Sequence, residues 1–213
     1  MKVGKLTLHL IIISCWVFSC GEEPDDNGLI DDIDPDEARR TNQCGLYPEQ
    51  TTSQYILPYS VGESYEISQG NCTNNSHREG TLGQFAYDFL QPIGTSILAV
   101  RGGTVISKKE SYANDTGIPG QENFVFINHG DGTQGRYFHL NTQGVHVEKG
   151  QLVQQGDIIA EGGNSGGTPF PHLHLEVIRL NSSGGDPVAL TFRNTRPHPT
   201  GLLKGQSYVA LEF

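Results

Sequence analysis

The sequence of 213 residues has no excess of positive charge: 14 lysines and arginines stand against 24 acidic residues, a formal net charge of -10. No basic patch is present that would favour nucleic acid as a partner. A long hydrophobic run is also missing, since the apolar stretch over residues 6–19 is too short for a comfortable membrane span. We therefore expect no nucleic-acid partner.

The N-terminal residues instead have the pattern of an export signal. Lys2 and Lys5 precede the apolar stretch, as in a secretory signal peptide. The stretch ends in Val-Phe-Ser-Cys at residues 17–20, which resembles a bacterial lipobox. We therefore expect residues 1–19 to be a lipoprotein-type signal peptide, with Cys20 carrying the lipid. A plain signal peptide cut nearby, or an uncleaved anchor, is the alternative.

Negative charge is concentrated directly after Cys20. Nine acidic residues and two arginines occupy residues 21–40. Such a stretch cannot form a hydrophobic core, so residues 20–43 are predicted to be a disordered acidic tether. The location expected from both features is the bacterial cell envelope, in an exported protein that is lipid-anchored to the outer membrane. Acidic residues behind the lipidated cysteine also resemble the surface-export signals of some outer-membrane lipoproteins.

Cysteine is scarce, and only Cys44 and Cys72 remain beyond Cys15 and Cys20. In an exported protein, two such cysteines are expected to form a disulfide. It would close a loop of about 28 residues and contribute roughly 3 kcal/mol on the loop-entropy account. A pair of thiolate metal ligands is the less favoured alternative at this spacing.

Residues 44–213 are predicted to form one domain that is mostly β. The chain has 27 glycines and 11 prolines, with short apolar runs between turns. Residues 54–58 and 64–67 are expected to form edge strands and loops. Strands are expected at 85–90, 123–128 and 135–140, and a short helical turn could begin at 186–190. The loop at residues 162–167 is rich in glycine but lacks the frame of a phosphate loop. Close approach to a substrate peptide fits it better.

The clearest chemical signal is the pair His172 and His174 in an alternating apolar run. On a strand, residues two apart point to the same face, roughly 6.6 Å apart. Imidazole is a common zinc ligand and titrates near neutrality, so one histidine could bind a metal and the other its bound molecule. A pair of ordinary solvent-facing histidines is the competing interpretation.

Further candidates are Asp88, placed between aromatic residues, and His139, at the end of an apolar strand. A carboxylate on such a strand is either a hard oxygen ligand or a hydrogen-bonded turn residue. An isolated histidine such as His139 is more often structural than catalytic. His198, between two prolines, is expected to be a loop residue.

Taken in order, these motifs resemble the zinc endopeptidases typified by lysostaphin and LytM. The resemblance covers most of residues 70–190. Its pieces are His77 with Tyr87-Asp88-Phe89, residues 92–95, 99–105, 128–132, 137–140, 150–153, 156–159 and 163–166, and the His-Leu-His-Leu-Glu-Val run at 172–177.

The resemblance implies a compact antiparallel β fold, a duplicated hybrid motif, with a substrate groove across the sheet. It implies one Zn²⁺ per chain held by His77, Asp88 and His174, with His139 and His172 as the catalytic pair. Glu176 could support the metal ligand or simply face solvent. One departure is the spacing: Asp88 comes eleven positions after His77, whereas the family's usual motif places the aspartate four positions after the histidine.

The function implied is a zinc-dependent metalloendopeptidase, in which a metal-activated water and two assisting histidines hydrolyse peptide bonds in peptidoglycan cross-links or stem peptides. Two alternatives remain open. One is a non-catalytic peptidoglycan-binding or amidase-activator module of the same fold. The other is a secreted endopeptidase that acts on protein.

Overall fold

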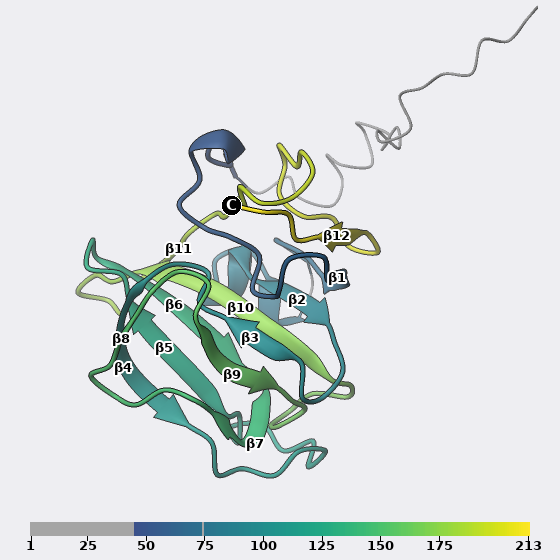
Figure 1. Ribbon diagram of the computed structural model, residues 1–213, viewed down its shortest axis with the longest axis vertical. Helices are drawn as coiled ribbons and strands as arrows, with labels where there is room; N and C mark the ends of the chain where they lie inside the picture. Colours follow the sequence, from purple (N-terminus) through teal and green to yellow (C-terminus); the bar gives the residue numbers. More distant parts are fainter. Residues whose placement is uncertain (1–44, 74) are drawn as a thin grey trace, which may run out of the picture. The chain divides into compact units, whose positions relative to one another are not determined.

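The computed structural model describes residues 45–73 and 75–213, which belong to one compact unit (Figure 1). Every pair of named strands in this part is antiparallel. The prediction of a mostly β, antiparallel domain is therefore confirmed. The predicted signal peptide, tether, lipidated Cys20 and Cys44 lie outside the described residues.

A nine-stranded sheet has the order β12-β1-β2-β10-β6-β5-β4-β8, with β11 paired to β10. Its strands are β1 (Ser64–Gln69), β2 (Tyr87–Leu90), β4 (Gly103–Lys109), β5 (Phe124–Asn128), β6 (Thr133–Phe138), β8 (Leu152–Val153), β10 (His172–Arg179), β11 (Asp186–Pro187) and β12 (Ser207–Val209).

A three-stranded sheet has the order β3-β9-β7. It consists of β3 (Ser96–Leu98), β9 (Ile158–Gly162) and β7 (Leu140–Val145). Apolar residues of both sheets form one buried cluster, which includes Val125, Leu173 and Leu175 of the large sheet and Ile97 and Ala160 of the small one. The alternate residues of the large sheet point to its other face, because side chains along a strand alternate.

The helical content of the described residues is limited to three 3-10 turns: η1 (Gln50–Thr52), η2 (Asn75–His77) and η3 (Leu82–Phe85). Of the two segments expected to form edge strands and loops, residues 64–67 lie in β1 and residues 54–58 form no strand. In the latter, Ile56 and Leu57 are buried in an irregular segment held by the bonds from Ile56 N to Val100 O and from Leu57 N to Asn194 Oδ1. One local prediction is wrong. Residues 186–187 form β11 rather than a helical turn, because they pair with the end of β10.

The first and last described segments hold each other in place. The Gln50 amide donates to the carbonyls of Phe192, Thr195 and Arg196, and its oxygen accepts from the His198 N–H. His198 is thus a buried structural residue within a loop. The C-terminal segment also extends the large sheet, because β12 pairs with β1, the strand that precedes η2 in the chain.

No helix in residues 45–73 and 75–213 is long and apolar enough to cross a membrane.

Candidate metal and active site

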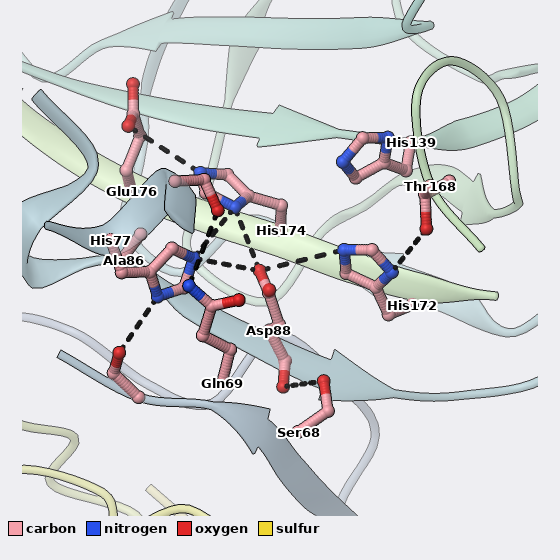
Figure 2. Close-up of polar contacts among 12 residues, drawn as sticks. Ser68, Gln69, His77, Ala86, Asp88, His139, Thr168, His172, His174 and Glu176 are labelled. Carbon is pink, nitrogen blue, oxygen red and sulfur yellow. Dashed lines mark hydrogen bonds and ion pairs between the residues drawn. The ribbon is translucent and has the colours of Figure 1, made fainter. Parts of the chain in front are cut away.

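Three elements bring His77, Asp88 and His174 together (Figure 2). β2 and β10 pair in a register that places Asp88 directly opposite His174. On β10, Leu173 and Leu175 enter the core, so the histidine at 174 must point to the opposite face. His77 reaches the same point from the end of η2.

The donor atoms of these three residues form a small triangle. Asp88 Oδ1 lies 2.8 Å from His174 Nδ1 and 3.2 Å from His77 Nε2, and the two histidine nitrogens are 3.2 Å apart. A tetrahedral zinc ion with bonds of about 2.0–2.1 Å would hold its ligand atoms roughly 3.3 Å apart. The triangle therefore fits a metal ion of this kind, with one side open for a further ligand.

Electrostatics also suit a cation between these side chains. Burial raises the pKa of Asp88, but His174 and His77 more than offset this and hold it well below its ordinary value. Burial lowers the pKa of His174, but the carboxylates of Asp88 and Glu176 outweigh this and raise it to about 10. Without a metal, a proton on His174 supplies positive charge that a bound cation would replace.

The long spacing between His77 and Asp88 is accommodated by η2 and η3, which lie side by side. A Cβ on Gly83 would lie only 2.5 Å from the Ser76 carbonyl oxygen, so this contact requires glycine. His77 Nδ1 donates to the Gly70 carbonyl over 2.9 Å, which leaves Nε2 free to face Asp88. The eleven-residue spacing therefore still brings both side chains to one point.

His172 and His139 lie beside this triangle, with their ring centroids 4.6 Å apart. His172 Nε2 is 3.7 Å from Asp88 Oδ1. Burial lowers the pKa of both histidines, and the neighbouring His172 adds to the effect on His139, whose pKa falls to about 4. Both rings are consequently neutral at pH 7.

A family model for peptidase family M23 matches residues 83–189. The chain belongs to peptidase family M23. The match begins after His77, so this residue enters the site from outside the matched stretch. Membership of this family confirms the recognition made from the sequence motifs.

Two curated relatives from Vibrio cholerae are named peptidoglycan DD-endopeptidases ShyA and ShyB. Each is 38% identical to this M23 chain, over 92 and 95 residues. The alignments cover 43% and 44% of this chain but only 19% and 20% of the relatives. The chain thus spans about a fifth of the length of these proteins. A solved structure, described as the M23 metalloprotease pseudoalterin, shares the fold: TM-score 0.50, 17% identity, 76% of this chain and 97% of that one.

One segment, residues 165–170, holds both histidines of the M23 site. His139 Nδ1 donates to the Ser165 carbonyl over 2.8 Å, and His172 Nδ1 donates to the Phe170 carbonyl over 3.0 Å. Thr168 Oγ1 lies 3.1 Å from His172 Nδ1. Since both Nδ1 atoms carry the proton, both Nε2 atoms present a lone pair.

Buried polar residues anchor this segment. Ser165 Oγ accepts from the Asn123 N–H and donates to the Leu140 carbonyl, and the Asn123 amide also donates to that carbonyl. These bonds hold Leu140, the residue after His139. His139 itself adopts a left-handed backbone conformation with φ 61°. The glycine-rich pattern did not indicate this role, and a lone Asn before an apolar strand carries no sequence signal for it.

Behind His174, a buried ion pair lies on the same face of the sheet. Glu176 Oε2 is 3.6 Å from His174 Nε2, and Glu176 Oε1 is 3.2 Å from Arg136 Nη1. Burial raises the pKa of Glu176, but His174 and Arg136 outweigh this and lower it, so the carboxylate stays ionised. Of the two sequence interpretations of Glu176, the solvent-facing one is wrong, because only 6% of the residue is exposed.

Asp88, His139, His172 and His174 line a cavity of about 640 Å³. Its lining also includes Gln69, Glu122, Phe138, Pro169 and Phe170. An extended peptide is the kind of ligand that such an open, mixed polar and apolar groove can accept.

Cys72 is disulfide-bonded. Because Cys44 is outside the described residues, the pairing of Cys44 with Cys72 stays a prediction.

Proposed function

We propose that this chain is a zinc-dependent endopeptidase that hydrolyses peptide bonds in peptidoglycan. The observation that carries the proposal is one cluster of side chains. His77, Asp88 and His174 converge within reach of a single ion, and two neutral histidines lie beside them. Three protein ligands with one open position are typical of catalytic zinc sites, whereas structural sites use four.

In this proposal the metal ligands are His77, Asp88 and His174, an N₂O donor set that suits zinc. When bound, zinc supplies Lewis acidity that makes water a better nucleophile and polarises a carbonyl. The ionised Asp88 provides negative charge to the ion, and Gly70 and Glu176 orient the two histidine rings through their other nitrogen.

His139 and His172 are the proposed catalytic residues. Because their Nδ1 atoms are bound to main-chain carbonyls, each Nε2 can accept a proton from the attacking water. Once protonated, the same nitrogen can donate to the oxyanion or to the leaving amine. Two neighbouring neutral rings can divide these tasks between them.

The substrate class is supported by the relatives, which are named peptidoglycan DD-endopeptidases. An envelope location would place the chain at that substrate. We propose export by residues 1–19 and anchoring to the outer membrane through lipid on Cys20. Radiolabelled palmitate incorporation tests the anchor, since Cys20→Ala would abolish labelling and release the protein from membranes.

The function is tested on the full chain by zinc analysis together with digestion of purified peptidoglycan. We expect about one zinc per chain and release of soluble muropeptides. Asp88→Ala should lose both zinc and activity, whereas His139→Ala should keep zinc and lose roughly 10²–10³-fold in rate.

Other outcomes would contradict parts of the proposal. A folded protein that takes up no zinc would make the groove a binding surface, as in a non-catalytic module. Cleavage of a glycine-rich protein without cleavage of peptidoglycan would identify a protein-directed endopeptidase. Full activity in His139→Ala would overturn the role of that histidine.

A further inference from the structure

Strand pairing places a row of side chains across the large sheet, starting at the site. His174 faces Phe138, Phe138 faces Phe124, and Phe124 faces Lys109. Directly facing residues of antiparallel strands point to the same side of a sheet. The four side chains therefore share the face that carries the candidate site, opposite the hydrophobic core.

Aromatic rings form the middle of this row. The Phe124 and Phe126 rings stack with centroids 4.5 Å apart, and Phe138 lies 5.3 Å from Phe126 and 5.6 Å from His174. All three phenylalanines are half-buried, whereas their neighbours Val125 and Tyr137 are fully buried in the core. The apolar surface of the groove thus continues from Phe138 to Phe124.

Lys109 ends the row as a cation without a counter-charge. No ion pair of Lys109 occurs among the described residues, and its Nζ lies 4.6 Å from the centroid of the Tyr112 ring. The adjacent Lys108 points to the other face and pairs with Glu110 and Glu148.

The other charges near the row are already engaged. Arg136 is paired with Glu176 and donates to Gln134. The Glu122 carboxylate accepts from the N–H groups of Gly120 and Gly167. Lys109 is consequently the group in this row that is left to receive a negative charge from a ligand.

We propose that the row from Phe138 through Phe124 to Lys109 is a substrate subsite for an acidic peptide. It rests on the proposed function, because the cleaved bond is taken to lie at the metal site. An extended peptide would cover the phenylalanines with its apolar part and place a carboxylate at Lys109. Three strand spacings separate His174 from Lys109, about 14 Å, which corresponds to roughly four extended residues.

The test uses soluble cross-linked muropeptides whose carboxylates are either free or chemically amidated. Full-length parent, Lys109→Gln and Lys108→Gln proteins are compared for kcat/KM, and for Kd by calorimetry. Lys108→Gln is the matched control, because the neighbouring lysine lies on the opposite face. Calorimetry measures binding independently of turnover.

We expect Lys109→Gln to lower kcat/KM and weaken binding about 3- to 10-fold for the free carboxylate form. The same variant should leave kcat/KM and Kd for the amidated form unchanged. Lys108→Gln should change these values for neither form, and Phe124→Ala should weaken the binding of both forms to the same extent.

Equal behaviour of Lys109→Gln and Lys108→Gln on both forms would overturn the subsite while leaving the endopeptidase proposal intact. The subsite would also be overturned if neither the free nor the amidated muropeptides bound to the protein. Absence of cleavage by any protein, with the expected pattern in Kd, would instead contradict the proposed function and retain the subsite.

Discussion

At the residue scale, the surroundings divide the histidines around Asp88 into two kinds. His174 lies between the carboxylates of Asp88 and Glu176, which raise its pKa to about 10 despite burial. Burial lowers the pKa of both His139 and His172, and the nearby Asp88 carboxylate does not outweigh it. The first kind of environment attracts a cation, and the second keeps an imidazole free to accept a proton.

Glu176→Gln tests whether the Glu176 carboxylate helps His174 to bind the metal. The variant removes the negative charge 3.6 Å from His174 Nε2 and leaves Arg136 without its ion-pair partner. We expect zinc affinity to fall about 10- to 100-fold, because residues that orient a ligating histidine contribute this much. Competition with a fluorescent chelator measures the zinc Kd.

Glu161→Gln is the matched control, since this carboxylate pairs with the half-exposed His146 away from the groove. Its zinc affinity should equal that of the parent. Equal affinities in Glu176→Gln and the parent would show that the carboxylate plays no part in holding the metal ligand.

At the scale of elements, β10 and the segment before it have different roles in the site. β10 directs His172, His174 and Glu176 to one face through its alternation, while its other residues anchor the strand in the core. The segment at residues 165–170 then sets the orientation of the His139 and His172 rings. The placement of the proposed metal ligand His174 and the orientation of the His139 and His172 rings therefore depend on different parts of the chain.

Ser165→Ala tests whether this segment positions His139. The change removes the bonds to the Asn123 N–H and the Leu140 carbonyl but keeps the Ser165 carbonyl that holds His139. We expect kcat to fall about 10-fold or more, since small displacements of a catalytic group are costly. KM and zinc content should stay unchanged, as measured by steady-state kinetics and metal analysis.

Ser53→Ala is a matched control, because buried Ser53 also accepts from a backbone N–H, that of Tyr55, and donates to a backbone carbonyl, that of Thr191. Both variants should lose about 1–3 kcal/mol of stability. If Ser53→Ala lowers kcat as much as Ser165→Ala, the effect reflects general destabilisation.

At the scale of the whole molecule, the stability of the folded protein depends on buried titratable groups. His129 lies in the turn after β5, with Nδ1 3.0 Å from Thr133 Oγ1. Its Nε2 is buried and has no hydrogen-bond partner among the described atoms. Burial and the nearby Arg101 lower the pKa of His129 to about 4.

This shift predicts acid sensitivity. Between pH 6.5 and about 4 the unfolded chain binds a proton at His129 that the folded protein does not bind, so stability falls as the pH decreases through this range. Urea unfolding at pH 7, 6, 5 and 4 should show the loss in the parent and less of it in His129→Gln. His146→Gln, at a half-exposed histidine, should behave like the parent.

The sequence by itself determined a mostly β domain and the common face of His172 and His174, because turn residues and period-two alternation act over a few neighbours. The antiparallel arrangement and the family were implied by the resemblance of its ordered motifs to the lysostaphin and LytM peptidases. It also identified Asp88, His139 and His77 as candidates through the order of motifs.

Only the tertiary structure decided how those candidates meet. The close packing of η2 on η3 at Gly83 and the left-handed backbone at His139 are local conformations that no sequence motif indicated. The Ser165–Asn123 anchor joins residues far apart in the chain. The same is true of the row that ends at Lys109, which exists only through the register of four strands. No short stretch of sequence encodes such contacts, because each depends on packing between separate elements.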